Sequence, residues 1–368
     1  MFSELSETHD ANRFLQLTPE RYASLLPERC AGLDAEFASS RSHRVLARSC
    51  FFRLQRLLFG ESPNQQASSQ SPSMHKRSVL LEGRHLSGKS VLLACAVAWL
   101  REHGWMCMYL PDASSFTRLS DFKFNEAADM YDAPLASQRL IQQLAAPNAS
   151  FLSEAQTRLE HSEATREALR NASDHVQNCI SVDGGDEEGL EAVSAGPSGS
   201  VLELAQVALS SEHEDGNDVT DICLDTFQEL KSISGVPVLL AVDNINTLSW
   251  DTSFYEVPND RGLSNIQAGE FRHVEAVRDM QSPPSNGAYL GVTSRNAGVN
   301  ARRQVRQVPK GARRTVSRFD LLETTSALAN YRHSGGSALG QLDEERARYL
   351  HMLSCGNPGE LMHLMRFH

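Results

Sequence analysis

Between a short apolar run and a helical pattern lies the stretch Gly83-Arg84-His85-Leu86-Ser87-Gly88-Lys89-Ser90. Its glycines allow the backbone to curl so that several amide N–H groups point into one concavity, and the following helix adds the positive end of its dipole. Lys89 is expected to reach the β and γ phosphates of a nucleotide, and Ser90 to hold Mg²⁺. We therefore predict that the loop from Gly83 to Val91 binds a nucleotide, with no chemistry assigned to the His85 side chain. The alternative is an ordinary glycine-rich turn with an exposed lysine.

The residues around this loop predict an α/β fold, in which a parallel sheet is flanked by helices. Short apolar runs predict buried strands at Ser78–Glu82, Trp105–Leu110, Val236–Asp243 and Ala288–Ser294. Helical patterns occur at about 11–60, Lys89–Leu100, Leu135–Leu144, Ser150–Ala172, Val201–Ala208, Val219–Ser232, 270–280, Phe319–Tyr331 and Asp343–Leu353, and a last short helix follows Gly356-Asn357-Pro358-Gly359.

The same patterns divide the chain into three regions. A helical N-terminal extension and linker is expected at 1–73, because 60–73 is rich in Ser, Gln and Pro. The nucleotide-binding domain is expected at 74–300, with an acidic low-complexity insertion near 178–218. A basic segment and a C-terminal helical region would occupy 301–368.

The composition of the 368 residues is that of a globular protein, with 40% hydrophobic and 22% charged residues. No apolar run is long enough to cross a bilayer, so a soluble protein is expected. The seven cysteines contain no C-x-x-C pair, and they predict reduced thiols in an intracellular or organellar compartment rather than a zinc site or a disulfide framework.

Charge is unevenly distributed along the chain, whose net charge is −11. The segment between Arg295 and Arg318 contains no acidic residue and includes Arg302, Arg303, Arg306, Lys310, Arg313 and Arg314. These cations are predicted to contact the phosphates of a nucleic acid, and such binding should weaken steeply with added salt. The alternative is a solvated loop.

Further nucleotide ligands are expected at the ends of two strands. Asp243 ends the most strand-like run of the chain and is predicted to fix Mg²⁺ through a water. The next residue is Asn244, where hydrolysing relatives carry a glutamate that positions the attacking water, so slow or absent turnover is expected. Ser294, or Thr293 before it, could sense the γ phosphate with Arg295 as a charge partner. An Asn-Lys-x-Asp element that would read guanine is absent, so the motifs leave guanine and adenine open.

With these residues in place, the chain resembles the death-associated protein 3 family, a GTP-binding component of the small subunit of mitochondrial ribosomes. The resemblance rests on the loop Gly83–Ser90 and on Gly104-Trp105 through Tyr109-Leu110-Pro111-Asp112-Ala113, Gly199-Ser200-Val201-Leu202-Glu203, Leu240-Ala241-Val242-Asp243-Asn244-Ile245-Asn246 and Gly356-Asn357-Pro358. It implies a fold similar to AAA-type and STAND P-loop domains, a mitochondrial matrix location in the head of the small subunit, and contacts to ribosomal RNA and neighbouring proteins. Asn357-Pro358 resembles an element that closes over the base in related ATPases.

The resemblance favours a structural ribosomal protein that holds GTP or GDP with Mg²⁺ as a stabilising ligand. Two alternatives stay open, namely an NTPase switch that times small-subunit assembly and a STAND-type signalling switch without a ribosome. The chain departs from the family in its acidic balance. It also departs at Met1–Asp10, which lacks the Arg-rich pattern of a transit peptide, so the mitochondrial address is expected from the resemblance alone.

Overall fold

The structure of the chain is a computed structural model that describes residues 5, 7–59, 77–117, 122–180, 200–210, 216–249, 251–256, 264–293, 308, 311–334 and 342–367. Its strands are β1 (Phe14–Gln16), β2 (Arg44–Leu46), β3 (Arg77–Glu82), β4 (Met106–Leu110), β5 (Lys123–Asn125), β6 (Met130–Asp132), β7 (Val238–Val242), β8 (Asp251–Glu256), β9 (Ser264–Gln267), β10 (Gly287–Val292) and β11 (Arg313–Thr315). Its α-helices are α1 (Glu7–Asp10), α2 (Pro19–Leu25), α3 (Ala31–Ser40), α4 (Ser49–Phe59), α5 (Lys89–Glu102), α6 (Pro134–Ala145), α7 (Ala149–Glu154), α8 (Glu163–Ile180), α9 (Val201–Ser210), α10 (Gly216–Ser232), α11 (Arg272–Arg278), α13 (Leu321–His333), α14 (Glu344–Ser354) and α15 (Pro358–Phe367). Among these helices, none has the length and apolar character needed to span a membrane.

A five-stranded sheet lies at the centre of the molecule, in the order β11-β3-β10-β7-β4. Every neighbouring pair in it is parallel. The carboxyl ends of β3, β10 and β7 therefore lie next to one another, and ligands of open parallel sheets bind at such an edge. The predicted α/β fold, a parallel sheet flanked by helices, is confirmed.

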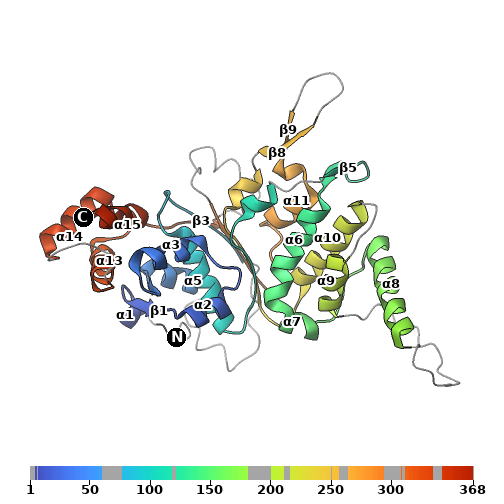
Figure 1. Cartoon of the computed structure of the whole chain (residues 1–368), viewed down its shortest axis with the longest axis horizontal. Coiled ribbons are helices and arrows are strands. Elements are labelled where there is room, and N and C mark those ends of the chain that lie inside the picture. The colour runs from blue at the N-terminus through green and yellow to red at the C-terminus, as the bar shows by residue number, and fades with distance from the viewer. Residues whose placement is uncertain are drawn as a thin grey trace.

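The two faces of the sheet are covered by different parts of the chain (Figure 1). One face packs against α5 and the N-terminal helices, and the other against α6, α9, α10 and α11. Alternate strand residues supply the two cores, because side chains of a strand point to opposite faces in turn. In β4, for example, Met106 and Met108 belong to the core on the side of α6 and α10, whereas Cys107 and Tyr109 belong to the core on the side of α5. This sheet is buried on both sides, as the continuous apolar runs predict.

The N-terminal region contains more than the helices expected at 11–60. β1 precedes α2, and β2 lies between α3 and α4. The two strands pair antiparallel, with Leu15 opposite Val45. The sequence did not predict these strands, because each is only three residues long and its partner lies far along the chain. All of these elements share the core that also contains α5 and one face of the sheet.

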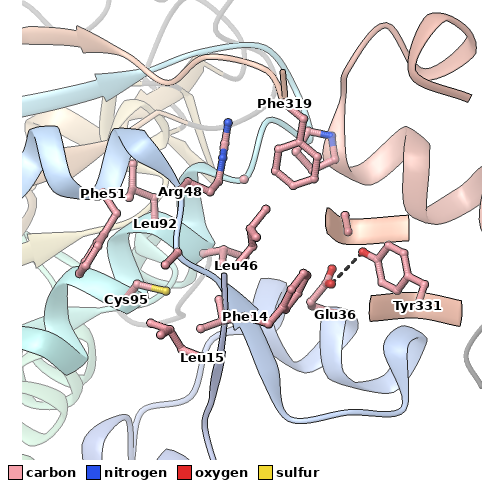
Figure 2. Close-up of a pocket in the computed structure, with 16 residues that line it drawn as sticks. Phe14, Leu15, Glu36, Leu46, Arg48, Phe51, Leu92, Cys95, Phe319 and Tyr331 are labelled. Atoms are coloured by element: carbon pink, nitrogen blue, oxygen red, sulfur yellow. Dashed lines mark hydrogen bonds between the residues drawn. The ribbon is translucent and has the colours of Figure 1, made fainter. Parts of the chain in front are cut away.

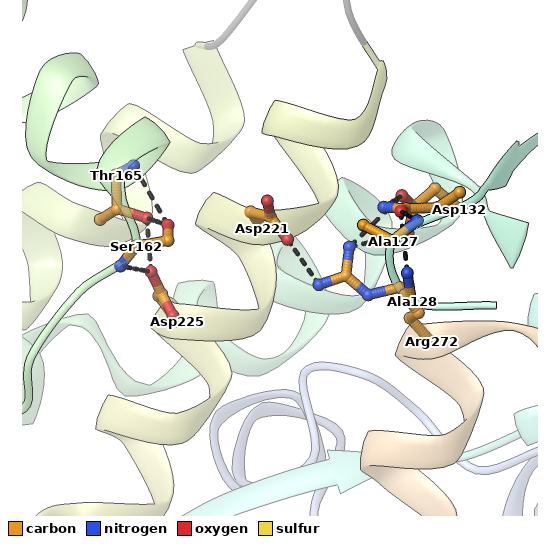
Figure 3. A network of polar contacts seen from close by, with 9 residues as sticks. Ala127, Ala128, Asp132, Ser162, Thr165, Asp221, Asp225 and Arg272 are labelled. Atoms are coloured by element: carbon orange, nitrogen blue, oxygen red, sulfur yellow. Dashed lines mark hydrogen bonds and ion pairs between the residues drawn. The ribbon is translucent and has the colours of Figure 1, made fainter. Parts of the chain in front are cut away.

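The predicted helix Ser150–Ala172 is wrong, because the structure breaks it into α7 and α8. Glu229 of α10, which is 1% exposed, accepts hydrogen bonds from the backbone N–H groups of Arg158 and Leu159 at 2.8 and 2.7 Å. These bonds hold the connecting residues against α10 in a non-helical conformation. Asp225 then accepts from the Ser162 backbone N–H at 2.7 Å and fixes the start of α8 (Figure 3).

The C-terminal helices α13, α14 and α15 form a small module with its own core, built around Leu328, Tyr331, Leu350 and Leu361. A capping box starts α13, since Asp320 accepts from the Glu323 backbone N–H and Glu323 accepts from that of Asp320. The module lies beside the N-terminal helices, at the opposite end of the molecule from α8 (Figure 1). It follows β11, so the chain returns from the sheet edge to the N-terminal region.

Candidate nucleotide-binding site

The loop Gly83–Gly88 connects β3 to α5, as the sequence predicts. Gly83 is required by space, because a Cβ there would lie 2.9 Å from both Ser87 Oγ and the Val316 carbonyl oxygen. Gly88 has a φ of +85°, a left-handed conformation that glycine adopts without strain. Leu86 also has a positive φ, 59°, which is uncommon for a residue with a side chain. The backbone is therefore held in the tight curl that a phosphate-binding loop needs.

Lys89 is the first residue of α5 and is 7% exposed. Its Nζ donates hydrogen bonds to the carbonyl oxygens of Gly83 at 3.2 Å and Arg84 at 2.8 Å. Burial lowers the pKa of the Lys89 ammonium, and the neighbouring charge of Asp243 opposes that shift. The cation is thus held inside the loop by carbonyl groups alone, where an anionic phosphate would be a stronger partner.

Asp243 follows β7 directly and is 3% exposed. Burial raises the pKa of its carboxyl group to about 6, and three partners oppose the shift: the Ser90 hydroxyl, the Asn244 backbone N–H and the Lys89 charge. The Asn244 N–H donates to Asp243 Oδ1 at 2.8 Å. The structure therefore brings together Lys89, Ser90 and Asp243, the residues predicted to hold phosphate and Mg²⁺.

Asn244 lies in the left-handed region, with a φ of 58°. Its Nδ2 donates to Asp112 Oδ1 at 2.9 Å, at the end of the neighbouring strand β4. The amide therefore ties two strand ends together. A neutral amide engaged in this way cannot accept a proton from water as a carboxylate would.

The two candidates for sensing the γ phosphate have different outcomes. Ser294, with its proposed partner Arg295, lies outside the described residues. Thr293 is 1% exposed, and both its backbone N–H and its Oγ1 donate to the Leu81 carbonyl oxygen, at 3.1 and 3.3 Å. Its hydroxyl is engaged in the sheet, so the geometry does not favour Thr293 as a sensor.

The start of α15 covers the loop from the C-terminal module. Asn357 Nδ2 donates to the His85 carbonyl oxygen at 2.8 Å, and the Gly359 N–H donates to that of Leu86 at 3.2 Å. A Cβ on Gly359 would lie 2.5 Å from Leu86 Cβ, so only glycine allows this approach. The sequence predicted Asn357 and Pro358 at the site, and the structure places them against the loop.

Arg48, which no sequence pattern singled out, joins three parts of the chain. Its Nη1 donates to the Ser87 carbonyl oxygen at 2.9 Å, and its Nη2 donates to that of Ser317 at 2.7 Å. The same guanidinium pairs with Glu323 at 3.3 Å and lies 4.7 Å from the centre of the Phe319 ring. Both charged side chains are buried, at 9% and 2% exposure. An N-terminal residue therefore holds the phosphate loop and the C-terminal module together.

Beside this ion pair, a cavity opens between the paired strands β1 and β2, the start of α5 and the C-terminal module (Figure 2). It is lined by Phe14, Leu15, Glu36, Val45, Leu46, Ala47, Arg48, Phe51, Gly88, Val91, Leu92, Cys95, Phe319, Ala327, Tyr331 and Pro358. Gly88 and Val91 belong to the predicted nucleotide loop, so the cavity is continuous with it. Pattern reasoning missed this site because its walls come from both ends of the chain. The one local signal was Asp320-x-x-Glu323, which marks the helix start that positions Glu323.

The basic segment is described only in part. Arg302, Arg303, Arg306 and Lys310 lie outside the described residues. Arg313 and Arg314 lie on β11 rather than in a loop, and Arg313 pairs with Glu82 of the neighbouring strand β3. Arg314 is exposed, and its Nη1 donates to the Arg313 carbonyl oxygen at 2.8 Å. A contact of this segment with nucleic acid stays a prediction.

A comparison with models of known families matches residues 64–308 of the 368 to the family described as mitochondrial ribosomal death-associated protein 3. The match contains the phosphate loop and Asp243, whereas Glu36, Arg48 and the C-terminal module lie outside it. A search of curated proteins returned no match. The family predicted from the sequence is confirmed.

Proposed function

Because the chain belongs to the mitochondrial ribosomal death-associated protein 3 family, we propose that it is a structural component of the small subunit of the mitochondrial ribosome. In this proposal it holds GTP or GDP with Mg²⁺ and turns over slowly or not at all. The observation that carries the nucleotide part is the convergence of Lys89, Ser90 and Asp243 at the curled loop after β3. The family match supports the ribosomal part.

The residues present fit a bound nucleotide in three respects. Ser87 Oγ is buried without a hydrogen-bond partner among the described residues, and it lies inside the loop. Gly83 keeps a side chain away from Ser87 Oγ and the Lys89 side chain, and Gly88 allows the left-handed turn of the loop. Lys89 has carbonyl partners but no carboxylate partner within hydrogen-bond distance among the described residues, which leaves its charge available to a phosphate.

Each residue then has a defined part in binding. The backbone from Gly83 to Val91 would surround the phosphates, and Lys89 would neutralise them. Ser90 and Asp243 would hold Mg²⁺, which is usually bound by one or two protein ligands together with phosphate and water oxygens. Bound Mg²⁺ would supply positive charge next to the phosphates. Asn244 offers no carboxylate to activate water, and this supports a stabilising rather than a catalytic role.

Ribosomal contacts are proposed to come from the basic segment. Arg314 is an exposed cation of β11, and the predicted contacts Arg302, Arg303, Arg306 and Lys310 precede it in the sequence. In this proposal they neutralise phosphates of the small-subunit ribosomal RNA, while neighbouring ribosomal proteins contact other surfaces. Co-sedimentation of the native protein with mitochondrial small subunits tests the proposal. A protein that sediments only free of ribosomal particles would leave the signalling alternative.

The nucleotide site is tested with Lys89→Ala, because removal of the cation from the loop should abolish binding. GDP with Mg²⁺ at a hundredfold excess over its dissociation constant should stabilise the wild-type protein by about 2.7 kcal/mol, and the variant by almost nothing. Differential scanning calorimetry and the nucleotide content of the purified protein measure this. Lys123→Ala, at an exposed lysine of β5, is the matched control and should behave as wild type.

Two results would contradict this reading of the site. Equal stabilisation of the wild type and Lys89→Ala would remove the role given to the loop. Multiple-turnover phosphate release, abolished by Asp243→Ala, would establish an NTPase switch in place of a stabilising ligand.

A further inference from the structure

The cavity beside the phosphate loop has apolar walls and few polar groups. Its charged lining residues are Glu36, from α3, and Arg48. Each of the three guanidinium nitrogens of Arg48 already donates a hydrogen bond, to Ser87, Ser317 or Glu323. Glu36 is therefore the charged group of this lining that remains open to a ligand.

The Glu36 carboxylate is held in place by one residue of the C-terminal module. The Tyr331 hydroxyl donates to Glu36 Oε1 at 2.7 Å, and Tyr331 is 4% exposed (Figure 2). Burial raises the pKa of Glu36, and the hydrogen bond from Tyr331 opposes the shift because it favours the ionised form. A carboxylate has about four acceptor positions, so one phenol donor leaves acceptors on both oxygens.

We propose that Glu36 selects guanine, by accepting hydrogen bonds from the ring N1–H and the exocyclic amine of the base, with Tyr331 as the residue that positions its carboxylate. The inference rests on the proposed function, since it assumes that phosphates occupy the adjacent loop. Gly88 and Val91 belong to the predicted nucleotide-binding stretch and also line the cavity, so a base that extends from loop-bound phosphates into this cavity would meet Glu36.

The chemistry of the bases explains the selection. Guanine presents two donors side by side on this edge, and an ionised carboxylate supplies two acceptors. Adenine presents the N1 acceptor there, which would face a carboxylate oxygen and leave both groups without a partner. Xanthine keeps the N1–H but carries an oxygen in place of the amine. The rings of Phe14 and Phe319 line the cavity and would hold a planar base between apolar surfaces.

The test is a competition assay with full-length protein, in which unlabelled GDP, IDP, XDP and ADP displace a fluorescent GDP analogue in the presence of Mg²⁺. Wild-type protein should bind GDP about 10- to 100-fold tighter than ADP or XDP, the range typical of a bidentate base contact. IDP, which lacks the exocyclic amine, should fall between GDP and ADP. This part of the test needs no variant.

Glu36→Gln gives the sharpest outcome, because a carboxamide offers one acceptor and one donor and so matches xanthine. The variant should lose GDP affinity and gain XDP affinity, which shifts the ratio of the two dissociation constants about 100-fold or more toward XDP. Tyr331→Phe should weaken GDP binding severalfold without any gain for XDP. Asp34→Asn, on the same helix α3 but outside the cavity, is the control and should keep the wild-type order.

Distinct outcomes separate this inference from the proposed function. Wild-type protein that binds GDP and ADP equally overturns the role of Glu36 while the phosphate site stands. An unchanged XDP-to-GDP ratio in folded Glu36→Gln does the same. Wild-type protein that binds none of the four nucleotides overturns both.

Discussion

Asp132 and Asp243 are buried aspartates in two different regions, and burial raises the pKa of both. Asp132, at the end of β6, is 0% exposed and accepts from Asn125 Nδ2 at 2.8 Å. Arg272 Nη1 donates to both of its carboxylate oxygens, at 3.2 and 3.3 Å. Arg272 also pairs with Asp221 of α10, so β6, α10 and α11 are joined (Figure 3). Among the described residues, the groups that favour the ionised form of Asp243 are the Ser90 hydroxyl, the Asn244 N–H and the Lys89 charge.

The comparison indicates that the Asp132 carboxylate stabilises the fold, whereas the Asp243 carboxylate is available to a ligand. At Asp132 the chain itself supplies the cation and the amide that burial requires. At Asp243 the nearest cation is Lys89, which donates its hydrogen bonds to loop carbonyl groups instead, and burial raises the pKa of the carboxyl group to about 6. Local rules of stability are broken most often at functional sites. Asp243 fits that pattern, as does Ser87 Oγ of the same loop region, which is buried without a hydrogen-bond partner among the described residues.

The largest effect on stability is expected from Arg272→Met, which removes the ion pairs of Arg272 with Asp132 and Asp221. Asp132 would lose its cation while it stays buried, and removal of one partner of a buried pair costs about 3–5 kcal/mol. The free energy of unfolding from urea denaturation measures this. The rise in melting temperature caused by GDP with Mg²⁺ should remain as in wild type. Arg348→Met, which breaks an exposed pair with Glu344 on α14, is the control and should cost below about 0.5 kcal/mol.

A second prediction concerns Asp243 at the nucleotide site, where a substitution should raise the free energy of unfolding instead of lowering it. The pKa of Asp243 is raised from 3.8 to about 6 on folding, so its contribution to stability is fully present below pH 3.8 and is lost as the pH rises to about 6. Asp243→Asn should not show this loss of stability, because the amide does not ionise. The nucleotide-free variant should match wild type near pH 4 and exceed it by up to about 3 kcal/mol above pH 6.

Urea denaturation of both proteins across this pH range gives the comparison. The variant should at the same time lose the stabilisation by GDP with Mg²⁺, because a metal ligand is gone. A difference in unfolding free energy that stays constant from pH 4 to pH 8 would contradict the unusual titration of Asp243.

The smallest effect is expected at Asp225, a side chain of α10 that holds the first turn of α8 in place. Its Oδ2 accepts from the Ser162 N–H at 2.7 Å and from Thr165 Oγ1 at 2.6 Å (Figure 3). Asp225→Ala should cost about 1–2 kcal/mol, because it removes the acceptor of two hydrogen bonds at the start of α8. Hydrogen exchange at the start of α8 should increase, and nucleotide binding should not change. Unchanged exchange there would show that the first turn of α8 does not depend on Asp225.

The parts of the fold predicted from the sequence are those encoded by neighbouring residues. The phosphate loop, β3, α5 and the aspartate after β7 each follow from a local pattern of glycine, apolar and charged residues. The break between α7 and α8 does not, because the cause is Glu229, about 70 residues away. There the tertiary hydrogen bond overrides a helical periodicity.

The site shows the same limit. Lys89, Ser90 and Asp243 were predicted, since motif spacing identifies them. Glu36 and Arg48 were missed, because a single acid or arginine in an apolar region becomes informative only when Tyr331 and Glu323 lie beside it. Ser294 and most of the basic segment lie outside the described residues, so those assignments stay predictions.

The contacts of Arg48 and Asn357 with the phosphate loop also affect how the protein is made. A chain is synthesised from its N-terminus, and its early segments can fold first. The loop at Gly83–Gly88 receives its cover only when residues 357–359 have been added, and the Arg48 pair closes only after Glu323. A product truncated before α15 keeps the loop sequence but lacks the cover. Nucleotide retention would therefore report that synthesis has reached the C-terminal helix.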